Sequence, residues 1–136
     1  MSVEKTQQLV QQYYQYFNEK NWKGMLDLLS EDVVHYINQG GLESGKDAFF
    51  QFLLEMDAHY DEHLSEIVVM VTPDGTRAAA ELVCTGRYIK QQSGMPPAYE
   101  QSYKVAVGAF FEIKNSKITR VTTYYNFPEW VQQVSR

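Results

Sequence analysis

The sequence has one cysteine, no long apolar run and no surplus of positive charge. Because Cys84 has no partner for an intramolecular disulfide, we expect a reducing compartment, and we interpret this residue as a small core side chain. No run of about 18 apolar residues predicts a membrane helix, and residues 1–12 lack the apolar centre of a signal peptide. These absences predict a soluble cytoplasmic protein without a membrane partner.

The formal charge of −5 and the lack of a basic cluster argue against nucleic acid as a partner. The patterns G-x-S-x-G, G-x-G-x-x-G and the P-loop are also missing, so no motif supports an acyl-enzyme mechanism, dinucleotide binding or nucleotide binding. Residues 59–63 fit H-x-x-E-H, but they span a predicted helix-to-strand connection, and we interpret this match as chance. We therefore expect no metal site and no cofactor.

The residues that are present favour one well-packed domain covering 1–136. Hydrophobic residues make up 44% of the chain and aromatic residues 14%. Apolar side chains recur at helical spacing in 3–19, 22–29 and 46–59, with Ser44 as a candidate cap for the third of these helices. The pattern then changes to alternation, which predicts strands at 64–71, 77–89, 100–114 and 117–125. A short strand at 33–37 and a last helix after Asn126 complete the series.

The segment from Tyr103 to Tyr125 is the most informative part of the chain. It predicts two long antiparallel strands joined at Asn115-Ser116, and the first strand is apolar on both alternating faces. We expect one face, which includes Val105, Val107, Ala109 and Phe111, to line the floor of a pocket. We expect the other, which includes Ala106, Gly108 and Phe110, to meet a second copy of the chain. Helices followed by antiparallel strands predict an α+β domain.

The order of these elements resembles the NTF2-like superfamily, in its ketosteroid isomerase and SnoaL-like polyketide cyclase branch. The residues that carry the resemblance are Val10-Gln11-Gln12-Tyr13, Asn18, MLDLLSEDVVHY, Gly45–Phe50, TRAAAELVCTGRYI, GMPPAYEQSY and FFEIKNSKITRVTTYYNFPEW. The last two are similar to the ketosteroid isomerase-related proteins. The resemblance implies a cone-shaped, strongly curved, mainly antiparallel sheet wrapped on about three N-terminal helices, with a short C-terminal helix. It also implies an apolar pocket inside the cone and a homodimer through the open face of the sheet.

The isomerase pattern places only one of its three catalytic groups on this chain. The helix-one tyrosine matches Tyr13, whereas the base falls at Ile37 and the protonated acid falls near Ala109. In ketosteroid isomerases the base removes a proton, while the tyrosine and the protonated acid bind the developing enolate oxygen. Because both carboxylates are missing, the resemblance implies a different reaction from steroid isomerisation by that mechanism.

Three residues are candidates for catalysis. His35 is two positions before Ile37 and faces the same side of its strand, where an imidazole could act as base, or it is a buried histidine bonded to a neighbour. Tyr13 could donate to a ligand carbonyl, or belong to a core stripe. Glu81 could titrate as an acid or base in the pocket, or it could lie outward as a solvated charge. Alternation places it on the same face as Val83, Thr85 and Arg87, and this mixture of apolar and polar side chains is compatible with either direction.

The remaining expectations concern the ligand. Residues predicted to line its site are Phe17, Ile37, Leu53, Val107, Ala109, Phe111, Tyr125, Asn126 and Trp130. Asn126 could bind a ligand, cap the following helix, or do both. The sequence thus predicts a cofactor-free isomerase, cyclase or dehydratase for a small apolar, polyketide-like or steroid-like molecule. A binding protein without chemistry and a dimeric association module are the alternatives.

Overall fold

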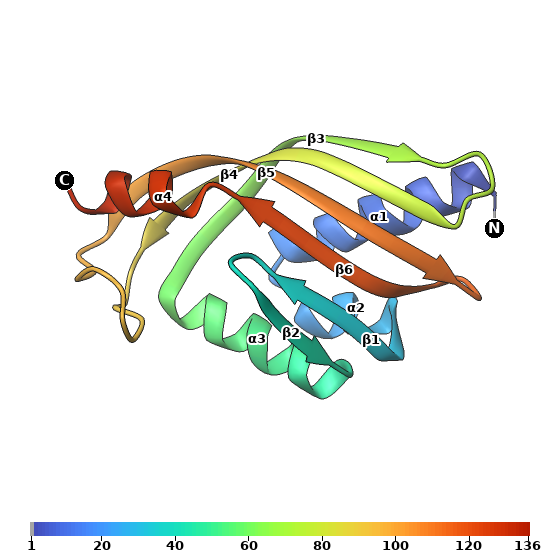
Figure 1. Ribbon diagram of the computed structural model, residues 1–136, viewed down its shortest axis with the longest axis horizontal. Helices are drawn as coiled ribbons and strands as arrows, with labels where there is room; N and C mark the ends of the chain where they lie inside the picture. Colours follow the sequence, from blue (N-terminus) through green and yellow to red (C-terminus); the bar gives the residue numbers. More distant parts are fainter. Residues whose placement is uncertain (1) are drawn as a thin grey trace.

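The computed structural model describes residues 2–136 and has the predicted α+β architecture (Figure 1). The helices are α1 (Val3–Asn18), α2 (Trp22–Asp27), α3 (Lys46–His59) and α4 (Phe127–Val134). The strands are β1 (Leu29–Ile37), β2 (Gly41–Ser44), β3 (Tyr60–Val71), β4 (Arg77–Tyr88), β5 (Gln101–Lys114) and β6 (Lys117–Tyr125). Within residues 2–136, no helix combines the length and the apolar character needed to cross a membrane.

Local hydrogen bonds explain where several elements begin. The Ser2 side chain accepts a hydrogen bond from the Lys5 amide at the start of α1, and Asn126 accepts one from the Glu129 amide at the start of α4. The prediction that Ser44 caps α3 was wrong. Gly45 is the N-cap, and its φ of 94° turns the chain sharply from β2 into the helix, a conformation that glycine adopts without steric cost.

Three strand predictions were incomplete. β1 begins at Leu29, so the chain enters the sheet two residues after α2 ends, whereas the prediction extended that helix to 29 and began the strand at 33. The short strand β2 was missed because Gly41–Ser44 lies directly after a glycine-rich turn. β3 begins at Tyr60 rather than at Leu64. Its start was missed because its first four residues are mostly polar and resemble a connection between elements.

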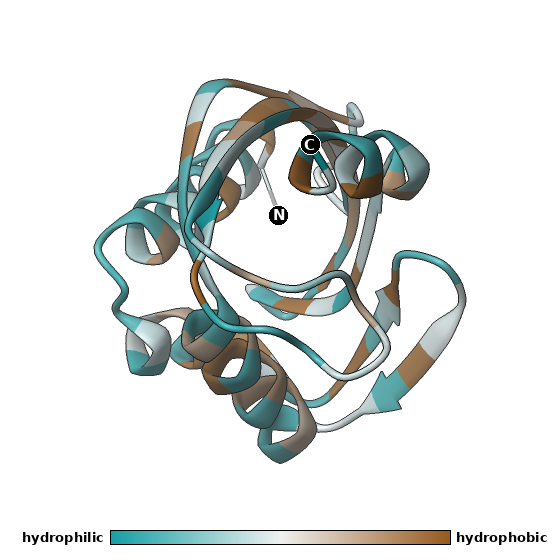
Figure 2. Ribbon diagram, turned by 90° about the vertical axis from the view of Figure 1, so that its left-hand side faces the viewer, coloured by the Kyte–Doolittle hydropathy of each residue, from teal (hydrophilic) through white to brown (hydrophobic). Residues whose placement is uncertain are grey.

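The six strands form one open, mixed sheet in the order β2-β1-β6-β5-β4-β3. All neighbouring strands are antiparallel except β1 and β6, which are parallel. Asn115 and Ser116 both have positive φ and connect β5 to β6, as the sequence predicted for this hairpin. Figure 2, viewed along the long axis of Figure 1, shows how strongly the sheet curves.

The curvature gives the sheet a concave inner face and an outer face. Every second residue of β4, from Ala78 to Tyr88, is buried on the inner face, while Glu81, Thr85 and Arg87 on the alternate positions are exposed. Helix α1 packs on β3 and β4, α3 packs on β1 and β2, and α4 lies beside β5. In β5 the inner row from Tyr103 to Ile113 is largely buried and belongs to the core, whereas its role as the floor of a ligand pocket stays a prediction.

Candidate active site around Glu62

A carboxyl group lies on the inner face of the sheet, where the surroundings are otherwise largely apolar. Glu62 of β3 is paired in register with Gly86 of β4, and Gly86 is paired with Tyr103 of β5. The Tyr103 hydroxyl reaches across β4 and donates a hydrogen bond of 2.6 Å to Glu62 Oε2. Glu62 remains half-buried, whereas Tyr103 is buried. The Tyr103 hydroxyl therefore holds the carboxyl on the inner face, while part of the Glu62 side chain remains exposed.

Burial raises the pKa of Glu62 above its usual range, and the hydrogen bond from Tyr103 partly opposes that rise. Burial also raises the pKa of the Cys84 thiol and of the Tyr103 hydroxyl, and the negative charge of Glu62 adds to both effects. Cys84 is thus a protonated side chain beside the carboxyl rather than a thiolate nucleophile. The raised pKa means that the Glu62 carboxyl keeps its proton to higher pH than an exposed glutamate does, which suits a group that takes up and releases a proton in a reaction.

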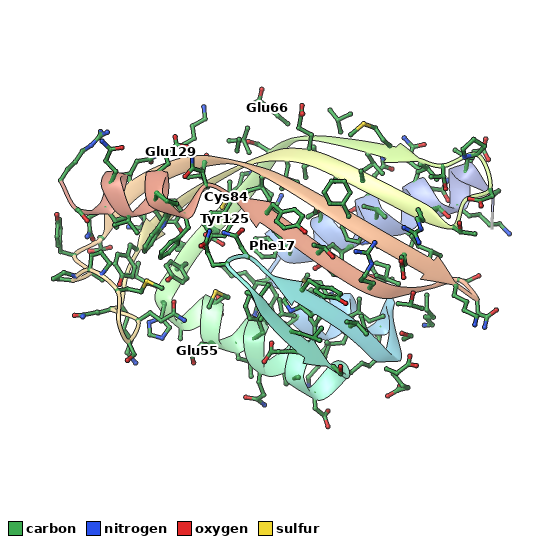
Figure 3. The ribbon with its side chains drawn as sticks, in the orientation of Figure 1. Phe17, Glu55, Glu66, Cys84, Tyr125 and Glu129 are labelled. Carbon is green, nitrogen blue, oxygen red and sulfur yellow. The ribbon has the colours of Figure 1, made fainter. Side chains whose placement is uncertain are left out.

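Tyr125 at the end of β6 belongs to the same region. Burial and then the charge of Glu62 raise the pKa of its hydroxyl, so the two side chains lie within electrostatic reach of each other. Its backbone is fixed by Asn38, whose side-chain amide donates to the Tyr125 carbonyl at 2.9 Å. Figure 3 labels Tyr125 and Cys84 near the middle of the curved sheet, whereas Glu66 projects from its outside.

An aromatic cluster closes the end of the sheet next to Glu62. Trp130 of α4 lies 5.1 Å from Tyr88, 5.8 Å from Tyr60 and 5.8 Å from Tyr103, measured between ring centroids. The connection between β4 and β5 is tied to the same cluster. Tyr60 donates to Gln92 Oε1 and Tyr88 donates to the Pro96 carbonyl, both at 2.6 Å. These rings form an apolar wall beside the carboxyl.

His35 lies in a different part of the core. It faces inward from β1, as expected, but its ring is 4.5 Å from the Phe49 ring and 4.6 Å from the Phe52 ring, both on α3. The side chain is 4% exposed, its Nδ1 atom has no hydrogen-bond partner, and burial lowers its pKa to about 4. The imidazole is therefore neutral near pH 7 and enclosed beneath α3.

The other two predicted catalytic residues do not converge with Glu62 either. Tyr13 is buried, and its ring packs edge-on against Tyr14 at 5.2 Å and Phe111 at 5.5 Å, as in the core interpretation of this stripe. Glu81 is exposed on the outer face, opposite Val68 and Gly108. Alternation had left the direction of Glu81 open, and the register of β4 places it outward.

The predicted ligand-lining residues divide by accessibility. Phe17, Ile37, Val107 and Tyr125 are half-buried, and all but Phe17, which lies on α1, belong to strands of the inner face. Leu53, Ala109, Phe111 and Trp130 are buried. Asn126 is exposed and caps α4 through the Glu129 amide, so its capping role is confirmed. The half-buried group is the part of this predicted set that remains partly exposed.

Glu62 was missed because the residues from His59 to His63 look like a polar connection. The available signal was the alternation of β3 continued backward from Leu64, which places Tyr60 and Glu62 on the inner side. That alternation also separates the H-x-x-E-H residues. His63 is exposed, whereas His59 is buried with its ring nitrogens at Glu55 and the Lys90 carbonyl. Within residues 2–136, no three acidic, histidine or cysteine side chains gather as metal ligands would.

Comparison with known proteins places this fold in a family. Residues 10–121 match the model of the SnoaL-like domain. A proposed polyketide cyclase from Xanthomonas campestris pv. campestris is 45% identical, with a TM-score of 0.95 over 97% of this chain and 98% of that one. A second, from Pseudomonas putida KT2440, is 46% identical, with a TM-score of 0.94 over 98% of each chain.

More distant structures share the fold alone. A proposed ketosteroid isomerase from Kribbella flavida is 21% identical, with a TM-score of 0.69 over 91% of this chain and 79% of that one. A search of the curated proteins gave no match. The predicted resemblance to the SnoaL-like proteins is thus confirmed, and the resemblance to the ketosteroid isomerase-like proteins is one of fold. The chain belongs to the SnoaL-like family of the NTF2-like fold.

Proposed function

We propose that this protein is a cofactor-free acid–base enzyme, an isomerase, cyclase or dehydratase that acts on a small carbonyl compound held against the inner face of the sheet. The observation that carries the proposal is the Glu62 carboxyl, which is half-buried among apolar residues and held by Tyr103 at 2.6 Å. The two proposed polyketide cyclases of the same family are consistent with such a reaction.

In the proposed mechanism Glu62 removes a proton from the carbon next to the carbonyl and later returns it at a second position. Its raised pKa makes the carboxylate a stronger base than an exposed glutamate and lets the acid form persist to higher pH, so that it can return the proton. Tyr125 is the proposed donor to the carbonyl oxygen on which negative charge develops, because its hydroxyl lies within electrostatic reach of Glu62. Phe17, Ile37 and Val107 would contact the apolar body of the ligand.

The distribution of charge favours a neutral substrate. Among the 12 lysines and arginines only Lys46 and Arg120 are half-buried, and the others are exposed. Lys46 pairs with Glu31 at 3.4 Å, and Arg120 pairs with Glu112 on the outer face at 3.3 Å. The cation that acts on Glu62 is the exposed Lys20, whose charge lowers the Glu62 pKa and which is already paired with Asp57 and Asp61 at 3.3 Å. A carboxylate or phosphate ligand on the inner face would lose its hydration without gaining an unpaired counter-charge.

Solvent deuterium exchange tests this function. The wild-type protein is incubated in D₂O with neutral 1,3-diketones, enones and steroid ketones, and deuterium incorporation next to the carbonyl is followed by NMR. Glu62→Gln should lower the exchange rate by about 10²–10⁴-fold, the usual contribution of a general acid or base. Glu81→Gln, which changes an exposed glutamate of the neighbouring strand, is the matched control and should retain the wild-type rate.

A third variant separates this proposal from the prediction that His35 is the base. If His35→Gln abolished exchange while Glu62→Gln left it intact, the assignment to Glu62 would be wrong. If ligands raised the melting temperature without any exchange in the wild type, the protein would be a binding protein with no chemistry. Absence of both responses across the panel would contradict a ligand site on the inner face.

The outer face supports the proposal that two copies associate through the sheet. Phe110 and Tyr124 are 45% and 57% exposed, and their rings lie 6.1 Å apart on neighbouring strands. A groove of about 910 Å³ beside them is lined by residues of both signs, among them Arg120 and Glu112. A two-fold interface brings the same patch of both copies together, so a patch with both charges can complement itself. Light scattering at micromolar concentration should give twice the chain mass of 15.8 kDa.

A further inference from the structure

Glu62 and Tyr103 belong to strands that are not neighbours. β4 runs between β3 and β5, and the residue of β4 that lies between the two side chains is Gly86. The hydrogen bond of 2.6 Å therefore spans the full width of a strand. In an ordinary sheet the side chain of the middle residue stands upright from the inner face and fills this position.

The absence of a side chain at residue 86 is what leaves room for the tyrosine. A β-carbon added to Gly86 would lie 2.5 Å from both Cζ and the hydroxyl oxygen of Tyr103, and 2.8 Å from Cε2. Real β-carbons do not approach other atoms so closely, so the ring would have to move. The same addition at Gly108, an outer-face glycine of β5, would meet no atom within 4 Å.

Backbone conformation does not explain the glycine. The glycines with positive φ in residues 2–136 are Gly40, Gly45, Gly75 and Gly94, so Gly86 has a φ open to any residue. A glycine inside a strand weakens the strand and commonly marks the close approach of another group. Here that group is the Tyr103 ring, which lies over Gly86 and carries its hydroxyl to Glu62.

We propose that Gly86 and Tyr103 form a positioning pair for Glu62: Gly86 provides the space, and the tyrosine hydroxyl donates to Oε2 and fixes the carboxyl on the inner face. The Cys84 thiol of β4 also hydrogen-bonds this carboxyl, and the charges of Lys20 and Asp61 act on it. This inference rests on the proposed function, in which Glu62 is the acid–base group. The hydroxyl is a donor to the carboxylate and so favours its ionised form, which counters the effect of burial. Loss of the tyrosine contact should therefore move the titration of Glu62 to higher pH.

The experiment measures that titration directly. The protein is labelled with ¹³C at glutamate side-chain carboxyls, the Glu62 resonance is assigned as the one missing from Glu62→Gln, and its shift is followed from pH 3 to pH 9. Tyr103→Phe, which keeps the ring over Gly86, should raise the Glu62 midpoint. Gly86→Ala should raise it in the same direction, and Gly108→Ala should leave it at the wild-type value.

Combined variants distinguish positioning from a general loss of packing. Gly86→Ala together with Tyr103→Phe should titrate no higher than the more affected single variant, because both remove the same hydrogen bond. Gly86→Ala together with Tyr103→Leu should recover thermal stability, because the clash is gone, and should keep the raised midpoint. If Gly86→Ala or Tyr103→Phe titrates like the wild type, the inference is wrong. The measurement does not depend on turnover, so an active Glu62→Gln enzyme would contradict the proposed function alone.

Discussion

Replacement of His35 by phenylalanine should make the stability of the protein much less sensitive to acid. His35 is 4% exposed and lies between two phenylalanine rings, and burial lowers its pKa from 6.5 to about 4. The folded state therefore resists protonation of this side chain, whereas the unfolded chain accepts the proton freely. Stability linked to His35 is complete above pH 6.5 and decreases as the pH falls toward 4.

The size of the effect follows from these two pKa values. Each pH unit over which only the unfolded chain holds the proton costs about 1.4 kcal/mol of the free energy of unfolding. The loss should reach about 2 kcal/mol at pH 5 and about 3 kcal/mol at pH 4. Phenylalanine has no proton to accept and suits the aromatic surroundings, so His35→Phe should lose that much less stability over the same interval.

Urea unfolding followed by circular dichroism between pH 7.5 and pH 4 measures the effect. Wild type and His35→Phe are compared with His63→Gln, which removes an exposed imidazole and should follow the wild-type pH dependence. The informative quantity is the difference between variants, because carboxyl groups elsewhere contribute equally to all three. If His35→Phe and wild type lost the same free energy between pH 7.5 and pH 4.5, the enclosed, neutral imidazole would be refuted.

Two further variants test the packing of the core and the association of two copies. Trp130→Ala should reduce the free energy of unfolding by about 3–5 kcal/mol, because the indole is 4% exposed and contacts four aromatic rings. Urea unfolding measures this loss, and a value below about 1 kcal/mol would contradict the packing described for Trp130. Phe110→Lys places a charge at the centre of the exposed outer patch and should halve the scattering mass with little change in the melting temperature of the dilute protein. An unchanged mass would contradict an interface at this face.

Local sequence patterns predicted most of the elements. The helical stripe of residues 3–19 and the alternation of the long β5–β6 hairpin specify which residues point inward, since a period of 3.6 or 2 directly encodes a buried face. The turn at Asn115-Ser116 was also predicted correctly: both residues have positive φ, a conformation in which asparagine is enriched. By contrast, β2 and the first turn of β3 are short or polar, and sheet pairing rather than local preference makes them strands.

The candidate site could be predicted only in part. Sequence reasoning selected Tyr125 and the half-buried residues Phe17, Ile37 and Val107, because they follow the inward alternation or helical stripe of a recognisable fold. It selected Glu81 rather than Glu62 because a charged residue within an apolar strand is unusual and suggests a functional role, whereas a charged residue within a polar segment gives no such signal. The direction of each glutamate depends on the register of β3 against β4, which is a property of the assembled sheet.

The sequence by itself therefore determined the fold of the domain: an α+β architecture whose β5 strand has an inner row of apolar side chains and an outer row that leaves Phe110 exposed. Only the tertiary structure decided what lies inside it. Glu62, Gly86 and Tyr103 are far apart along the chain and become one row when β3, β4 and β5 pair. Burial of the carboxyl and its bond to the tyrosine exist only in that row, because each depends on long-range strand pairing rather than on neighbouring residues.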